Sequence, residues 1–201
     1  MKTTTDHSQQ IREQVSASRD LAESIATDPE LLSRISAAAN ACINCFNAGS
    51  KVLLAGNGGS AADCQHIAGE FVSRFNFDRP GLPAFALTTD TSVLTAIGND
   101  YGYEQLFARQ LQATGREGDV FFAYSTSGQS PNIIAALKQA ASMRITTIGM
   151  TGNRGGQMNP LCDHLIDIPS DLTPKIQEGH LIVGHIICGL AEDALFGAAS
   201  K

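Results

Sequence analysis

A glycine-rich loop runs directly into a predicted helix that carries a histidine and a glutamate, within residues 55–71. The short apolar run before the loop predicts a buried strand. Gly56, Gly58 and Gly59 would let the backbone turn tightly and approach a ligand closely, and Ser60 is placed to cap the helix. Because a helix N-terminus readily binds anions such as phosphate esters, we interpret this segment as an anion site. An ordinary strand-to-helix turn is the alternative.

His66 and Glu70 lie one helical turn apart, so they share a face of the predicted helix. An imidazole nitrogen and a carboxylate oxygen are competent zinc ligands, and the same groups can act as general acid and base. The spacing is also common in surface pairs, so the pair by itself leaves a purely structural role open. With the loop, the pair suggests a metal or acid–base site beside an anion site.

The elements that would position these residues follow from the apolar pattern. Short apolar segments alternate with amphipathic ones, which predicts an α/β fold with a doubly wound parallel sheet covered on both faces. Ligands then sit beyond the carboxyl ends of the strands. We expect one domain over residues 1–201, with 1–48 as an N-terminal helical extension. The expected helices span 8–26, 29–47, 60–74, 91–98, 103–113, 130–142 and 174–197, and the expected strands 51–55, 83–87, 119–124, 145–149 and 164–168.

Hydroxyl side chains follow the third expected strand, in the loop STSGQSP. Hydroxyl and backbone donors here could form a phosphate cradle, without the lysine and the spacing of a P-loop. A serine-rich turn that caps the next helix is the alternative. The loop after the fourth strand, MTGNRGG, has fewer donors, and we interpret it as a plain loop. The candidate cradle residues are Ser125, Thr126, Ser127 and Ser130.

Asn99 and Asp100 fall in the segment TAIGNDYGYEQ, where we expect a turn between two helices. Their side chains could stabilise that turn or reach a sugar hydroxyl. The sequence leaves both interpretations open.

The last expected helix is apolar apart from a few polar residues. Thr173 is a candidate cap, and Pro174 fits the first turn. Gln177, His180 and His185 lie within the apolar run, where a lone histidine is usually a satisfied core residue. Gln177 and His185 are about 80° apart around the helix and roughly 12 Å apart along it, so periodicity alone does not pair them at one metal.

Composition and charge narrow the class of protein. With 201 residues, 43% hydrophobic and 17% charged, the chain can bury one substantial core. A net charge of -6 and a pI near 5.3 argue against general binding to nucleic acids or membrane surfaces. The first residues lack the apolar core of a signal peptide, and no apolar run approaches the roughly 20 residues of a membrane span. We therefore expect a cytoplasmic protein with no nucleic-acid or membrane partner.

Cys42 and Cys45 form a C-x-x-C pair of the kind found in redox or zinc sites. The chain has five cysteines, an odd number without a secretion signal, which disfavours a disulfide framework. Because both residues fall on the apolar stripe of the second predicted helix, we interpret them as two buried thiols.

Four motifs occur in the order GNGGSAADCQH, LTTDTSVLTAIGNDYGYE, STSGQSPN and KIQEGHLIVGH. Together they resemble the sugar isomerase (SIS) domain family and, within it, the phosphoheptose isomerases, over about residues 30–195. Each motif is weak alone, and the combination is specific. The resemblance implies a flavodoxin-like sheet and a homotetramer. It also implies conversion of D-sedoheptulose 7-phosphate to D-glycero-D-manno-heptose 7-phosphate, for ADP-heptose and lipopolysaccharide core synthesis.

The resemblance further implies roles for individual residues. On its basis we expect an enediolate route, in which Glu70 moves the proton between C1 and C2 and His185 assists ring opening or protonates oxygen, with Zn2+ as cofactor. The division of acid and base roles between these two residues stays open. The implied zinc ligands are His66, Glu70, Gln177 and His185. The implied sugar-phosphate contacts are Asn57, Gly58, Gly59, Ser60, Glu70, Asn99, Asp100, Ser125, Thr126, Ser127, Ser130 and Gln177.

A second class of protein with this fold is the alternative, a non-catalytic regulator of replication initiation that binds the initiator protein DnaA. The segments AEDALFG and FVSRF are similar to that regulator. Such relatives typically lack the carboxylate and the terminal histidine of the metal set, whereas this chain has Glu70 and His185, which favours the enzyme. A sugar-phosphate sensor is a third class, disfavoured because the sequence contains no DNA-binding domain and the metal set would be idle.

Overall fold

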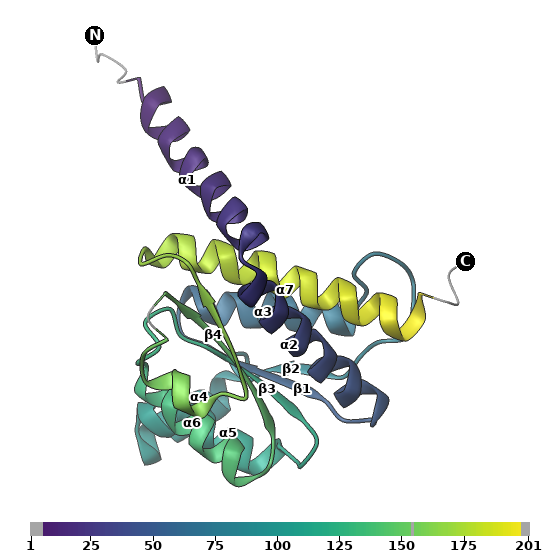
Figure 1. Ribbon diagram of the computed structural model, residues 1–201. Coiled ribbons are helices and arrows are strands. Elements are labelled where there is room, and N and C mark those ends of the chain that lie inside the picture. The colour runs from purple at the N-terminus through teal and green to yellow at the C-terminus, as the bar shows by residue number, and fades with distance from the viewer. Residues whose placement is uncertain (1–5, 154, 198–201) are drawn as a thin grey trace.

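A five-stranded parallel sheet forms the centre of the molecule, as the computed structural model shows for residues 6–153 and 155–197 (Figure 1). The strand order is β2-β1-β3-β4-β5, and every neighbouring pair is parallel. This is the order of a flavodoxin-like doubly wound sheet, so the predicted fold class is confirmed. The strands are β1 Val52–Ala55, β2 Ala84–Ala86, β3 Val120–Tyr124, β4 Thr146–Gly152 and β5 His164–Ile168.

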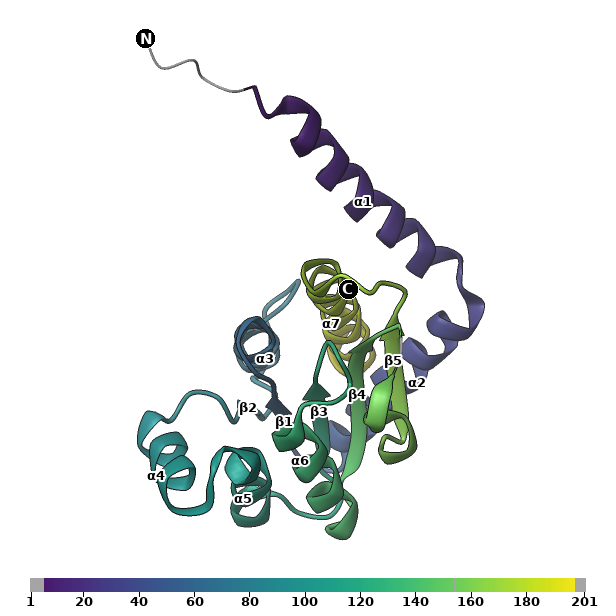
Figure 2. The same ribbon diagram turned by 90° about the vertical axis from the view of Figure 1, so that its left-hand side faces the viewer.

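Helices cover both faces of the sheet (Figure 2). One face packs on α2, α3 and α7, and the other on α5 and α6, with a separate apolar core on each side. The strands are apolar throughout because both faces are buried. The α-helices are α1 Ser8–Thr27, α2 Pro29–Asn47, α3 Gly59–Val72, α4 Thr91–Tyr101, α5 Leu106–Thr114, α6 Pro131–Ser142 and α7 Thr173–Phe196. Two short 3-10 helices are η1 Tyr103–Gln105 and η2 Gly156–Leu161.

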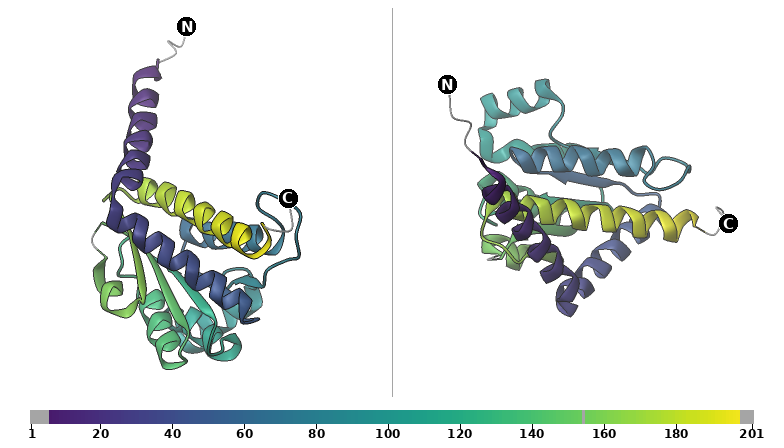
Figure 3. Two further views of the ribbon diagram at one scale, coloured as in Figure 1. Left: turned by 45° about the vertical axis from the view of Figure 1, so that its right-hand side comes forward. Right: turned by 90° about the horizontal axis from the view of Figure 1, so that it is seen from above.

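The first two helices differ in how they meet the body of the protein. Helix α2 starts where the Asp28 carboxylate caps two backbone amides, and its apolar stripe is buried in the core beside the sheet. Helix α1 projects away from the body (Figures 1 and 3), and only Leu21 and Ile25 of its residues are buried. Ile11 and Val15 on its outer half are exposed. Residues 1–48 therefore contain one core helix and one projecting helix.

Two predicted helix caps are wrong. Helix α3 begins one residue earlier than expected, at Gly59, so Ser60 lies inside its first turn and the N-cap is Gly58 with φ +56°. Helix α7 begins at Thr173, and its N-cap is Leu172, which has no capping side chain. In both places the chain enters the helix from a loop whose backbone conformation, rather than a capping side chain, sets the first residue.

The expected turn at Asn99 and Asp100 is also wrong. Helix α4 continues to Tyr101, so both residues lie in its last turn, and the chain turns at Gly102 with φ +83°. A glycine supplies this backbone conformation without steric strain. The polar side chains are therefore displayed from a helix end.

The cysteine pair on α2 is confirmed as structural. Cys42 and Cys45 are free thiols that face the core. Burial raises the pKa of Cys42 well above its usual value, and burial together with the nearby Asp119 carboxylate raises that of Cys45 to about 11. Protonated buried thiols are poor metal ligands and poor nucleophiles.

Helix α7 is long and apolar enough, by length and composition alone, to cross a bilayer. No apolar run of this length was expected from the sequence. Its apolar character has an explanation within the fold, because its inner side packs against α2, α3 and β4. A core helix that covers a sheet meets the same test of length and hydropathy.

Candidate metal centre and anion site

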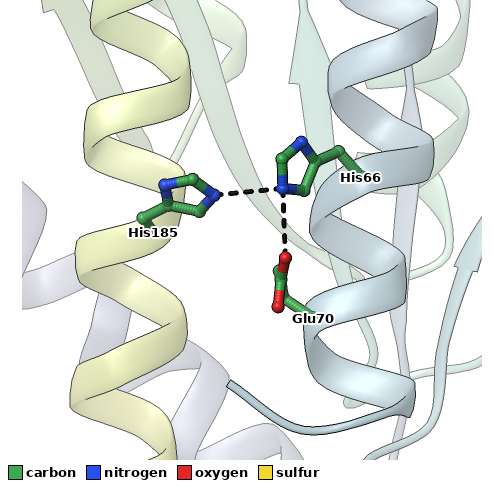
Figure 4. Close-up of side chains that lie close together, drawn as sticks. All are labelled: His66, Glu70 and His185. Carbon is green, nitrogen blue, oxygen red and sulfur yellow. Dashed lines mark hydrogen bonds and ion pairs between the residues drawn. The ribbon is translucent and has the colours of Figure 1, made fainter. Parts of the chain in front are cut away.

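His66, Glu70 and His185 point toward one another between α3 and α7 (Figure 4). The Nε2 atom of His66 lies 3.0 Å from Oε1 of Glu70 and 3.1 Å from Nε2 of His185. The three ligand atoms all lie within 4.8 Å of one another. The structure thus brings together two residues of α3 and one that follows 119 positions after His66.

The two helices can approach each other closely because α7 carries a glycine at the contact. A Cβ atom added at Gly184 would lie 2.6 Å from Cδ1 of Ile67, so a side chain there would have to displace the Ile67 side chain. His66 precedes Ile67, and His185 follows Gly184, so the two histidines flank this contact between the helices.

The donor set fits a divalent metal ion. Two imidazole nitrogens and one carboxylate oxygen are a common ligand set for catalytic zinc, which leaves a position open for water or substrate. Two Nε2 atoms that face each other satisfy one another only if one ring donates a proton, whereas a cation between them uses both lone pairs. The side chains of His66 and Glu70 are 44% and 26% exposed, so a small molecule can reach the group.

Gln177, the fourth implied ligand, lies in the first turns of α7, and its side-chain amide packs against the start of α3. A Cβ atom at Gly59 would be 2.5 Å from Nε2 of Gln177, so the glycine leaves room for the amide group. Gln177 precedes His185 by two helical turns, and its amide lies beside the anion loop. The structure therefore joins three of the four implied ligands in one group and puts the fourth against Gly59.

The loop after β1 is held in place by a network of amide groups. Asn57 and Asn132 form a reciprocal pair, in which each side-chain amide donates to the other's oxygen at 2.9 and 2.8 Å. The hydroxyl of Tyr103 donates to Oδ1 of Asn57 at 2.9 Å. Asn57 is thus oriented from α6 on one side and from η1 on the other, while Gly58 is exposed at the tip of the loop.

The serine hydroxyls after β3 gather at the start of α6, as the cradle interpretation requires. Oγ of Ser125 lies 2.9 Å from Oγ of Ser130 and 3.5 Å from Oγ of Ser127. Ser130 occupies the N-cap of α6, its side chain makes no capping bond, and Pro131 takes the first turn as expected. The hydroxyls thus bond to one another at the N-terminus of α6, the kind of position where proteins bind anions.

The MTGNRGG segment is more than a plain loop. Strand β4 continues to Gly152, whose backbone amide donates to the Thr126 carbonyl, so the segment begins in the sheet. A Cβ atom at Gly128 would lie 2.3 Å from the Gly155 carbonyl oxygen, so two glycine-bearing loops pack backbone on backbone. The glycines of this segment, which has fewer donors, therefore allow its backbone to pack directly against the serine loop.

Asn99 and Asp100 are exposed at the end of α4. Nδ2 of Asn99 donates to Oδ1 of Asp100 at 2.8 Å, and no other side-chain hydrogen bond of these two residues occurs within the described ranges. The structure therefore does not join them to the other site residues of the same chain. Tyr103, close behind them, is the part of this corner that reaches Asn57.

Three residues near the site were missed in the sequence. Asn132 and Tyr103 belong to the quoted motifs STSGQSPN and TAIGNDYGYE, so the motifs contained the signal. Asp63 lies one turn before His66 on α3, and its Oδ2 atom is buried without a hydrogen-bond partner among the described residues. Burial raises the pKa of Asp63, while the nearby His66 lowers it.

His180 is confirmed as a core histidine and does not join the group. It is fully buried, its Nε2 lies 3.1 Å from the Thr151 carbonyl oxygen, and its ring meets Tyr124 edge-on at 5.5 Å. Burial lowers the pKa of His180 to about 4, although the bond to Thr151 raises it. The ring is therefore neutral in the native protein at neutral pH.

We expect His180 to make the metal-free protein less stable in acid. Its native pKa is lower than its unfolded value near 6.5, so the unfolded chain gains a proton first as the pH falls. Stability is therefore lost between about pH 6.5 and about pH 4, by about 3 kcal/mol in total. Urea unfolding at pH 7.5 and pH 4.5 measures this loss, which His180→Gln should reduce and the exposed His7→Gln should leave unchanged. Equal losses in both variants would contradict the assignment.

Comparison with known proteins gives consistent matches. The sequence pattern of the SIS domain family matches residues 15–152. The phosphoheptose isomerase of Burkholderia pseudomallei strain K96243 is 65% identical over 90% of this chain and 91% of its own length. That of Aneurinibacillus thermoaerophilus is 59% identical over 92% of this chain and 94% of its own. The solved structure of phosphoheptose isomerase GmhA from Neisseria gonorrhoeae superposes with a TM-score of 0.87 at 37% identity, over 94% of this chain and 100% of the other.

Proposed function

We propose, because this chain belongs to the SIS domain family and within it to the phosphoheptose isomerases, that it converts D-sedoheptulose 7-phosphate to D-glycero-D-manno-heptose 7-phosphate. The observation that carries the proposal is the convergence of His66, Glu70 and His185 on the helix that follows the β1 loop and on α7. An isomerase of this kind needs a phosphate site, a base and an acid within one substrate length. The group and the loop provide candidates for all three.

The phosphate would bind the serine cradle at the N-terminus of α6, with Asn57 and the exposed amides of the β1 loop along the sugar. His66 lies two helical turns along α3 from Gly59, which is roughly 10 Å. An open-chain sugar phosphate can span this distance. Anchoring the phosphate at one end would then hold C1 and C2 of the sugar near Glu70 and His185.

Glu70 would take the proton from one of these carbons and return it to the other, and His185 would donate to or accept from the sugar oxygens. His66, 3.0 Å from the Glu70 carboxylate, would orient it. A zinc ion held by His66, Glu70 and His185, the three implied ligands that meet in this chain, would, when bound, polarise the carbonyl and hydroxyl oxygens of the substrate. A carboxylate that coordinates a metal tightly is a weak base. The two proposed roles of Glu70, metal ligand and general base, must therefore be separated by experiment.

The assembly we propose is a homotetramer of single-domain chains in the cytoplasm, whose product enters ADP-heptose and lipopolysaccharide core synthesis. Apolar side chains exposed on the outer half of α1 support association, as does a stripe on α7. The stripe consists of Ile182, Ile186 and Leu190, one helical turn apart, and it flanks His185. A neighbouring chain on this stripe would border the site and could contribute to it.

The test is a coupled assay of the purified protein with sedoheptulose 7-phosphate, in which the product is identified by chromatography against the authentic heptose phosphate. We expect turnover by the zinc-loaded protein. No turnover with any divalent metal, in a protein that remains folded and associated, would contradict the proposal. It would favour the DnaA-binding regulator, which a binding assay with purified DnaA would then examine.

A further inference from the structure

A buried ion pair joins the C-terminal end of α3 to α7, below the metal group. The guanidinium of Arg79 donates from Nε to Oε1 of Glu192 at 3.0 Å, and the two side chains are 2% and 0% exposed. Glu192 lies on α7 two helical turns after His185. We propose that Arg79 and Glu192 are positioning residues that hold His66, Glu70 and His185 in the arrangement that binds the metal, an inference that rests on the proposed function.

Arg79 acts first on the helix that carries His66 and Glu70. Its Nη2 donates to the backbone carbonyl of Glu70 at 2.9 Å, and its Nη1 donates to that of Phe71 at 2.6 Å. These are carbonyls in the last turn of α3, which lack partners within the helix. A cation at this end also interacts favourably with the helix dipole. Arg79 therefore fixes the backbone of the residue whose carboxylate joins the metal group.

Glu192 acts on the loop between α3 and β2. Its two carboxylate oxygens accept from the backbone amides of Phe75 and Asn76, at 2.8 and 2.6 Å. Burial raises the pKa of Glu192, but the hydrogen bonds from these amides and from Arg79 together lower it by more. The net shift of the pKa is therefore downward, and the side chain is charged at neutral pH. Every oxygen of this buried carboxylate has a donor.

The loop in turn contacts the metal group. The Phe75 ring lies 5.5 Å from the His185 ring at an angle of 38°. The ring packs against Gly189 of α7, where an added Cβ atom would make a tight contact of 3.3 Å with it. Glu192 therefore supports one side of His185 through Phe75, while Arg79 supports Glu70 from below. The two contacts meet at one ion pair.

Stability alone is a weak explanation for this pair. A buried ion pair adds little net stability, because both charges lose their hydration. What it does supply is a single geometry, since the planar guanidinium has fixed donor directions that a lysine cannot reproduce. Residues that orient metal ligands from outside typically change metal affinity or activity 10- to 100-fold when they are mutated, by general experience.

The chain contains a matched control outside the network of Arg79 and Glu192. Asp119 is a buried carboxylate that accepts from Nζ of Lys51 at 2.6 Å and from the backbone amides of Lys51 and Arg116. Like Glu192, it binds one cation and two amides. It directly precedes β3, and its partners Lys51 and Arg116 lie outside α3, α7 and the loop between α3 and β2. Glu192→Gln and Asp119→Asn thus remove the same kind of buried charge, one within the network that reaches His185 and one outside it.

The experiment measures three properties of both variants in the full chain. They are the zinc affinity by competition with a coloured chelator, the NMR signals of the His185 ring in the metal-free protein, and kcat and KM with sedoheptulose 7-phosphate. For Glu192→Gln we expect zinc affinity and kcat to fall about 10- to 100-fold, KM to change little and the His185 signals to lose the ring-current shift from Phe75. For Asp119→Asn we expect a lower Tm, with zinc affinity, kcat and KM within about twofold of the wild type and the His185 signals unchanged, because Asp119 does not orient a metal ligand.

A folded Glu192→Gln protein with wild-type zinc affinity and wild-type His185 signals would overturn the inference, as would equal changes in Asp119→Asn. Where Glu192→Gln does not fold, Arg79→Lys keeps the charge and loses the fixed donor directions, and it carries the same expectation. If the wild-type protein neither binds zinc nor turns over the sugar phosphate, the proposed function fails. The His185 signals, which need no metal and no substrate, then decide the positioning role by themselves.

Discussion

Replacing Glu70 by glutamine should lower kcat by about 10²- to 10⁴-fold, the range that a positioned general base contributes. The amide has the shape of the carboxylate and keeps an oxygen toward Nε2 of His66, 3.0 Å away in the native protein. It cannot accept a proton from the sugar. The donors of the serine cradle are unchanged, so binding of sedoheptulose 7-phosphate, measured by calorimetry, should stay within a few-fold of the wild type.

The same variant separates the two roles of Glu70. At saturating zinc, a protein that has lost only a ligand should recover its turnover, whereas a protein that has lost the base should not. We expect no recovery. Glu117→Gln is the control, because that carboxylate pairs with Arg144 on the surface and should leave kcat unchanged. Full activity of Glu70→Gln would remove Glu70 from the catalytic step.

Removal of divalent metal should abolish turnover, and one equivalent of zinc per chain should restore it. The reason is the donor set, in which Nε2 of His66, Nε2 of His185 and Oε1 of Glu70 lie within 4.8 Å of one another. Binding to the native state alone should also raise the free energy of unfolding, by about 2.7 kcal/mol at a free zinc concentration 100 times the Kd. Three measurements test this prediction: the turnover, the zinc content by mass spectrometry of the metal, and the thermal unfolding of the protein with and without zinc.

Two variants locate the zinc. His185→Ala should lose both the bound metal and the thermal shift, since it removes the only ligand that α7 contributes to the three-residue group. Cys42→Ala should retain both, because the C-x-x-C thiols are buried and protonated. If Cys42→Ala loses the zinc and His185→Ala keeps it, the metal binds at the buried thiols of α2 instead. Undiminished turnover in the metal-free protein would remove zinc from the mechanism.

Local sequence patterns were sufficient to predict the order of the elements. The apolar strands and the amphipathic helices between them occur close to the expected positions, because the burial of one face or both leaves a periodic trace in neighbouring residues. Helix boundaries were less predictable. Gly102, at φ +83°, ends α4 two residues after Asp100, and no periodicity of apolar residues distinguishes a polar last turn from a loop.

Topology rules extended the prediction to the location of the site. Since strands of a parallel sheet end at one edge, the loops at Asn57 and Ser125 were expected near each other. Their connection through Asn132 was not, because a hydrogen bond between two side-chain amides depends on how α6 is seated above the sheet. The same holds for Tyr103, which reaches the loop from a different helix.

The sequence by itself thus determined the fold class and, through the resemblance carried by its four motifs, the list of candidate residues for anion binding and for metal and acid–base chemistry, since both depend on residue type and position along the chain. Only the tertiary structure decided which of them meet. His185 joins His66 because α3 and α7 pack side by side at the contact between Ile67 and Gly184, and Gln177, on the same helix, lies two turns away against Gly59. A contact between residues so far apart in the chain is set by the packing of whole helices, and local periodicity carries no record of that packing.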